Sequence, residues 1–143
     1  MAMKRRASAH WSGNLKDGKG QISTETGVLR DAPYGFRSRF EDGPGTNPEE
    51  LIAAAHAGCY TMALAAALGQ AGFTAERIET NAVVTLDKDG EGFAITAVTL
   101  TCRAKVPVID TAAFDGIAQD TKRNCPVSKV LRADISLDAA LEG

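Results

Sequence analysis

The sequence is poor in the residues that cross-link small secreted proteins or bind metal ions, with three cysteines and two histidines among 143 residues. A secreted disulfide scaffold needs a denser, paired set of cysteines, so that class is excluded. Widely separated cysteines in a cytosolic protein are more often inert, metal-bound or catalytic than bridged. Beside the cysteines, a metal ion would find only the two histidines and scattered acids, so we predict no metal site.

An excess of charge of one sign is also absent, because the formal net charge is -2. We therefore expect no nucleic-acid partner and no attraction to anionic membranes.

The basic residues 1–6 are not followed by an apolar core, so we expect no secretion signal. The longest apolar stretch, 51–68, approaches the length of a membrane span, but it is rich in alanine and contains His56 and Cys59. A buried helix in a cytoplasmic protein is the better interpretation.

No internal repeat, low-complexity tract or long linker divides the chain. Its 143 residues, 44% hydrophobic and 24% charged, are enough for one domain with a substantial core. We predict a single domain over residues 1–143.

The N-terminal third predicts β-structure, with strands over 7–13 and 21–24 and an extended segment over 34–40. Strand-like alternation in the last of these would place Arg37 and Arg39 on the same side.

A long helix is predicted from Asn47 to about Leu68. Asn47 can cap it, Pro48 suits its first position, and the acids Glu49 and Glu50 favour the positive end of the helix dipole. The middle of this helix has no polar face, so we expect it to be covered on all sides.

The remaining residues predict two strands over 77–87 and 93–105, followed by an amphipathic helix over 110–122. A short helix is predicted from 125 and a last strand over 133–141. This order indicates an α+β fold, with antiparallel sheets packed around a buried central helix.

The three cysteines differ in local context. Cys125 precedes a proline at the start of a helix, where the dipole and free amides lower the pKa of a thiol, so catalytic and inert interpretations stand equal. Cys59 is mid-helix among small residues, and from the residues alone a buried structural cysteine is favoured. Cys102 lies among apolar residues of a strand, which predicts a core position.

His56 is three residues before Cys59, so the two share a helix face. A Cys/His nucleophile and a pair of metal-binding side chains are both conceivable. A core histidine with a satisfied hydrogen bond is the favoured interpretation.

Several motifs together resemble one known family. They are Pro33–Phe36, Arg39–Phe40, Gly45–Leu51, Ala54–Cys59 and Asn124–Ser128. With these blocks the chain resembles the OsmC/Ohr proteins over essentially its whole length, and within them the OsmC branch of osmotically inducible hydroperoxide reductases.

The resemblance implies a thiol peroxidase that reduces organic hydroperoxides without a cofactor, as an antioxidant in osmotic and oxidative stress. It implies that Cys59 attacks the peroxide, that Cys125 resolves the sulfenic acid as a disulfide, and that Arg39 pairs with Glu49. A dithiol, for example on a lipoylated protein, is implied as reductant, and a homodimer as the assembly. A fixed arginine would favour the thiolate and polarise the peroxide, and a carboxylate would hold that arginine.

The helix itself adds an argument for the dimer. Glu49 and Cys59 are ten residues apart, which is about 15 Å of helical rise. Even a long Arg39 would hardly reach both on one straight helix. We therefore expect an intertwined homodimer in which Arg39 and Glu49 act on Cys59 of the second subunit.

Two other functions stay open. One is a non-enzymatic stress-response protein that binds a small ligand in an apolar cleft and in which the cysteines have no catalytic role. The other is a Cys/His hydrolase that uses His56 and Cys59.

Overall fold

The computed structural model describes residues 2–143, which form two compact units, one up to Leu51 and one from Ile52 on. Together they hold two three-stranded sheets and one long helix, so the α+β class is confirmed. The prediction of a single functional domain stays a prediction.

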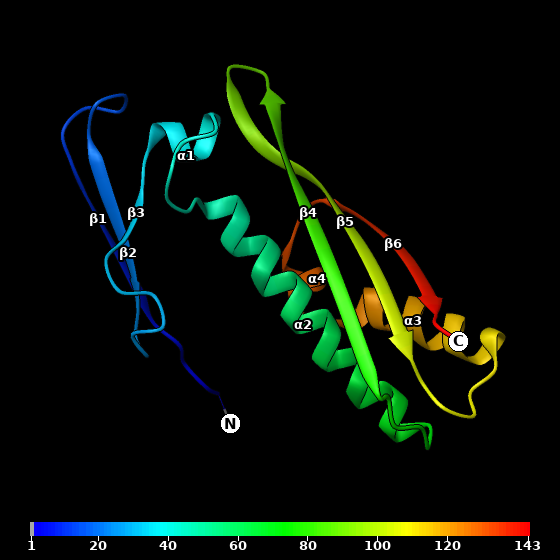
Figure 1. Cartoon of the computed structure of the whole chain (residues 1–143). Helices are drawn as coiled ribbons and strands as arrows, with labels where there is room; N and C mark the ends of the chain where they lie inside the picture. The colour runs from blue at the N-terminus through cyan, green and yellow to red at the C-terminus, as the bar shows by residue number, and fades with distance from the viewer. Residues whose placement is uncertain (1) are drawn as a thin grey trace. The chain divides into compact units, whose positions relative to one another are not determined.

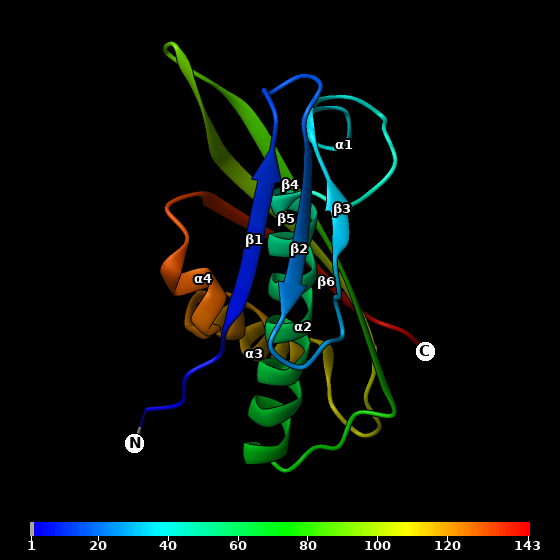
Figure 2. The ribbon, with the colours of Figure 1, turned by 90° about the vertical axis from the view of Figure 1, so that its left-hand side faces the viewer.

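The first unit is built on a small antiparallel sheet. Its strands are β1 (Ala7–Ser12), β2 (Lys19–Thr24) and β3 (Ala32–Tyr34), which lie side by side in that order (Figure 2). Gly20 on β2 allows the close approach of two aromatic rings, because a Cβ there would come within 2.6 Å of both Trp11 and Tyr34.

The prediction of an extended segment over 34–40 is wrong beyond Tyr34, because residues Phe36–Phe40 form the short helix α1. The Ser38 hydroxyl accepts from the Gly35 amide at 2.9 Å and donates to the Gly35 carbonyl at 3.1 Å. These local bonds turn the chain into a helix despite its alternating pattern. Arg37 and Arg39 are consequently about 200° apart around the helix instead of on one side.

The long helix α2 (Pro48–Gln70) begins where the sequence predicts. The Asn47 side-chain oxygen accepts from the Glu50 amide at 2.7 Å, and its amide nitrogen donates to the Ser38 carbonyl at 2.8 Å. Asn47 therefore caps α2 and ties it to α1.

One face of α2 is buried, through Tyr60, Leu64 and Leu68 among others. The opposite face is exposed and carries small or apolar side chains, namely those of Ala54, Ala55, Gly58, Met62, Ala65, Ala66 and Gly69. The expectation of a helix covered on all sides is thus wrong for the single chain. By length and composition α2 could cross a membrane, but its packed face makes it the core helix of a soluble protein.

The sheet of the second unit has the order β4-β5-β6. Its strands are β4 (Arg77–Asp89), β5 (Gly92–Lys105) and β6 (Asp134–Leu141), visible in Figure 1. The pairing of β4 with β5 is antiparallel, as predicted, but β5 and β6 are parallel, which corrects the expectation of purely antiparallel sheets. The reason is the path of the chain, because two helices between β5 and β6 return it to the end of the sheet where β5 begins.

The connection from β5 to β6 contains α3 (Thr111–Asn124) and α4 (Pro126–Val130). Phe114 and Ala118 of α3 join the buried side chains of α2 and β5 in one hydrophobic core. Cys102 of β5 is fully buried in this core, as predicted, and burial raises the pKa of its thiol.

A substitution in this core should be far more destabilising than one on the surface of the same unit. Leu100→Ala removes a fully buried side chain from β5 and should lower the free energy of unfolding by about 2–5 kcal/mol. Val130→Ala, at an exposed position of α4, should change it by less than about 0.5 kcal/mol. Denaturant unfolding measures both, and similar losses for the two variants would contradict this core.

Candidate active site

Two cysteine sulfurs from distant parts of the sequence meet in the second unit. Cys59 of α2 and Cys125, the residue that precedes α4, have their sulfur atoms 3.0 Å apart, within hydrogen-bond distance. Both are free thiols, and Cys59 is partly accessible whereas Cys125 is fully buried. A disulfide requires a sulfur–sulfur distance of about 2.05 Å, so the pair could close with a movement of about 1 Å.

The position of Cys125 follows from the helix boundary beside it. The residue ends α3 and caps α4, whose first position is Pro126. Burial acts to raise the pKa of Cys125, but hydrogen bonds from the Cys59 thiol, from the amide and hydroxyl of Ser128 and from the Val127 amide outweigh it and lower the pKa. In the neutral pair the Cys125 thiol donates to Cys59, and once Cys125 ionises the Cys59 thiol becomes the donor.

The thiol of Cys59 has the opposite tendency. Burial raises the pKa of Cys59, the hydrogen bond and charge of Cys125 raise it further, and only the Val127 amide lowers it. Over residues 2–143, no cation contributes to this shift. A thiolate at Cys59 therefore needs a positive charge in addition to what surrounds it here.

His56 and Ser128 lie beside the two thiols. His56 Nε2 and the Ser128 hydroxyl oxygen are 2.8 Å apart, and both side chains are buried. Burial lowers the pKa of His56, so its ring is neutral. The hydrogen bond that the sequence favoured for a core histidine is confirmed at this nitrogen. Nε2 bonds Ser128 and Nδ1 has no hydrogen-bond partner among the described residues, so neither ring nitrogen is bonded to the Cys59 sulfur, which speaks against the Cys/His hydrolase.

Arg39 and Glu49 form a bidentate ion pair within the first unit. Arg39 Nε and Nη2 donate to the two carboxylate oxygens of Glu49 at 3.1 and 3.0 Å. Glu49 is largely buried, and the guanidinium also stacks at 5.4 Å from the ring centre of Phe40. Such a pair holds the arginine in one orientation.

A hollow of about 350 Å³ opens beside Arg39 in the same unit. Aromatic and aliphatic side chains dominate its lining, which consists of Trp11, Leu15, Tyr34, Gly35, Phe36, Arg39 and Phe40. The hollow thus combines an apolar wall with one fixed cation.

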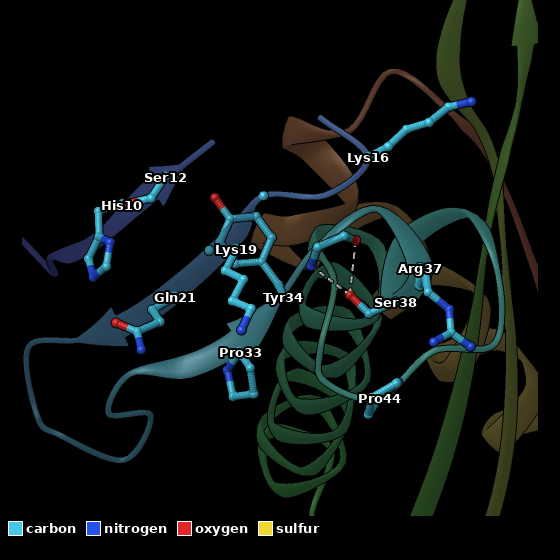
Figure 3. A pocket seen from close by; sticks show the side chains of 13 residues that line it. His10, Ser12, Lys16, Lys19, Gln21, Pro33, Tyr34, Arg37, Ser38 and Pro44 are labelled. Atoms are coloured by element: carbon cyan, nitrogen blue, oxygen red, sulfur yellow. Dashed lines mark hydrogen bonds between the residues drawn. The ribbon is translucent and has the colours of Figure 1, made fainter. Parts of the chain in front are cut away.

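Arg37 lies in a different setting. It makes a longer, exposed contact with Glu41 at 3.7 Å and lines a second hollow, of about 590 Å³, shown in Figure 3. Lys16, Lys19 and His10 also line that hollow, and no carboxylate of residues 2–143 does. Helix α1 therefore separates the two arginines into two surroundings.

Across residues 2–143, no three metal-binding side chains come together. Cys102 is buried on β5, and no hydrogen bond joins its sulfur to either of the other cysteines within that range. Sequence reasoning singled out Cys59, Cys125, Arg39 and Glu49, but it missed Ser128. The serine follows Cys125 by three residues at a predicted helix start, a spacing that could have indicated contact with the sulfur.

The comparison with known proteins gives a consistent result. The family described as OsmC-like protein matches residues 41–140. Peroxiredoxin OsmC of Escherichia coli (strain K12) is 55% identical over 142 residues, which cover 99% of this chain and 99% of that protein.

Solved structures agree in fold. The organic hydroperoxide resistance protein OhrB of Bacillus subtilis has 25% identity and a TM-score of 0.70, with 94% of this chain and 98% of that chain covered. An OsmC-like protein of Vibrio cholerae, with 14% identity, has a TM-score of 0.78 over 97% of this chain and 100% of that chain.

The hydrogen bond between the two thiols predicts a shift that can be measured. When Cys102 is replaced by alanine, the variant Cys59→Ala keeps Cys125 as its one thiol but removes the donor, so the pKa of Cys125 should rise. Cys59→Ser keeps an O–H donor and should raise it less. The ultraviolet absorbance of the thiolate against pH measures both, and equal values would contradict the proposed donor.

Proposed function

Because this chain belongs to the OsmC family, we propose that it is a thiol-dependent peroxidase that reduces organic hydroperoxides to alcohols. One observation carries the proposal, namely the two free sulfurs of Cys59 and Cys125, 3.0 Å apart, of which only Cys59 is accessible. The Cys59 thiolate attacks a peroxide oxygen, the O–O bond breaks, and the alcohol leaves with a proton. Cys125 then displaces water from the sulfenic acid, and an external dithiol reduces the disulfide.

The substrate we propose is a hydroperoxide with an alkyl or aryl group. The hollow beside Arg39 supports this class, because Trp11, Phe36 and Phe40 offer apolar surface next to a cation. Burial of an apolar group contributes about 25 cal/mol for each Å² removed from water, and hydrogen peroxide has no such group. The fixed guanidinium would polarise the peroxide oxygens.

We assign the activation of Cys59 to Arg39, held by Glu49. The pKa of Cys59 is raised, and no residue among 2–143 supplies it with a cation, so activation requires a positive charge from elsewhere. Glu49 lies ten residues before Cys59 on α2, about 15 Å along the helix axis. Arg39 of a second copy would supply the charge if two α2 helices paired in antiparallel fashion, with the start of one beside the middle of the other.

The exposed face of α2 supports an intertwined homodimer. Its small side chains permit close packing of a second helix, and a Cβ at Gly58 would meet no described atom within 4 Å. A continuous row of exposed small and apolar side chains on a soluble protein marks an interaction site. In the dimer the whole chain would act as one OsmC-like domain, in the cytoplasm, with a lipoylated protein or another dithiol as reductant.

The first test measures the chemistry directly. Without added reductant, the wild-type chain should consume one equivalent of cumene hydroperoxide and lose two free thiols. Cys59→Ser should consume none, because an alcohol cannot replace the thiolate nucleophile. Cys125→Ser should react once and then over-oxidise, because the thiol that traps the sulfenic acid is missing. An unreactive wild-type chain would instead favour a non-enzymatic ligand-binding protein.

The roles of the two arginines can be separated by stopped-flow oxidation of Cys59. Arg39→Ala should slow it on the order of a hundredfold, because loss of a preorganised cation commonly costs about 3 kcal/mol. Arg37→Ala, on the other side of α1, is the matched control and should slow it less than about threefold, since exposed pairs contribute little. The reverse order would assign the role to Arg37.

Complementation tests whether the sites are shared between subunits. Mixed in equal amounts, Arg39→Ala and Cys59→Ser chains, each inactive alone, should form heterodimers with one intact site. Activity should return to roughly a quarter of wild type if chains exchange at random. No recovery despite demonstrated exchange would show that each site is built within one chain.

A further inference from the structure

Two buried polar groups beside the thiols have no role in the reaction as described so far. His56 is fully buried on α2, and Ser128 is largely buried on α4. Their side chains are 2.8 Å apart, and the Ser128 hydroxyl also faces the Cys125 sulfur. His56, Ser128, Cys125 and Cys59 thus form a continuous chain of polar contacts within the second unit.

The direction of this chain follows from the unpaired nitrogen of the histidine. Among the described residues, His56 Nδ1 is the one buried side-chain nitrogen or oxygen without a hydrogen-bond partner. A buried N–H without an acceptor is rarer than a buried lone pair without a donor. The neutral ring therefore carries its proton on Nε2 and donates to Ser128. That bond leaves the Ser128 hydroxyl proton free to point at Cys125.

We propose that His56 and Ser128 are positioning residues that hold Cys125 ready to resolve the sulfenic acid, with His56 orienting the serine hydroxyl and the hydroxyl stabilising the Cys125 thiolate. The proposal rests on the function above. In the step it serves, the Cys125 thiolate forms a bond to the Cys59 sulfur while the S–O bond breaks. The departing hydroxide takes up the proton that Cys125 released, so that one disulfide and one water result.

The same arrangement determines which sulfur is released when the disulfide is reduced. The thiolate of lower pKa leaves faster, and the donors around Cys125 stabilise it as a leaving group. Cys59 is also the accessible sulfur of the pair. A dithiol reductant therefore attacks Cys59, forms a mixed disulfide there and expels the Cys125 thiolate. The second thiol of the reductant then attacks this mixed disulfide and releases Cys59. The reductant gives up two electrons in this exchange and leaves as a disulfide.

Few other titratable groups surround Cys125. From α2 these are His56, Cys59 and Tyr60, and from β5 it is Cys102. Burial lowers the pKa of His56, which keeps its ring neutral. Burial raises the pKa of both Tyr60 and Cys102, which keeps them neutral when Cys125 ionises. The pH dependence of the resolving step should consequently report Cys125 itself.

Separating the two chemical steps tests the proposal. In single-turnover reactions with cumene hydroperoxide, Ser128→Ala and His56→Leu should oxidise Cys59 within about twofold of the wild-type rate. Formation of the disulfide should slow about tenfold, because a hydrogen bond to a charged group is lost, and over-oxidised Cys59 should accumulate in mass spectra. The pH profile of disulfide formation should move to higher pH.

Conservative variants separate positioning from simple support of the fold. His56→Gln can place an N–H near the position of Nε2, and Ser128→Thr keeps the hydroxyl, so both should restore much of the lost rate. Lys129→Ala, exposed on the same short helix, is the matched control and should behave as wild type. Equal disulfide formation in Ser128→Ala and wild type, or no rescue by the conservative variants when all are folded, would overturn the proposal.

A titration that needs no peroxide distinguishes failure of this inference from failure of the proposed function. In a Cys59→Ser, Cys102→Ala chain, the ultraviolet absorbance of the thiolate reports Cys125 alone. Adding Ser128→Ala should raise the pKa of Cys125, and adding Ser128→Thr should not. An unchanged pKa in the alanine variant would refute the assignment even if the protein proved to be an active peroxidase.

Discussion

The packing of α2 against α3 and α4 is the interaction on which the rest of the site depends. Tyr60 is fully buried between these elements, and its hydroxyl donates to the Ala118 carbonyl at 3.1 Å. Around it lies the apolar core, which fixes α2 along its buried face. Because Cys59 and His56 are one residue and four residues before Tyr60, this packing sets the position of both against the start of α4. The chemistry of the thiols is thus a consequence of how the core is filled.

The two compact units differ in the charged and ionisable groups that each of them holds. The second unit holds both sulfurs in surroundings that favour an ionised Cys125 but not an ionised Cys59. The first unit holds the fixed cation, Arg39, in an apolar hollow with its carboxylate partner Glu49. In the dimer that we propose, Arg39 of one subunit would supply the positive charge that the Cys59 thiol of the other lacks.

Much of this arrangement could be predicted from the sequence, because it depends on local chemistry. Asn47 and Pro48 define the start of α2, and Pro126 places Cys125 at the start of α4, since capping preferences act over a few residues. The helix α1 was not predicted, because two hydrogen bonds of Ser38 override an alternating pattern. The parallel pairing of β5 with β6 depends on a connection of about thirty residues, which no local pattern encodes. The contact between His56 and Ser128 joins positions 72 residues apart, so it too follows only from the packed structure.

The two thiols differ in acidity in a way that suits two successive steps. The attacking residue must be a strong nucleophile at the moment when peroxide is present. A thiol of high intrinsic pKa gives a more nucleophilic thiolate, once a cation has stabilised the ionised form. The resolving thiol acts on a sulfur that is already in contact, so it needs mainly to be ionised, and it must later leave as a stable thiolate. Donors from α4 and Cys59 meet both needs at Cys125. A raised pKa at Cys59 is therefore compatible with the attacking role that we propose for it, because in the proposed dimer the Arg39 hollow would bring the cation and the peroxide to the thiol together.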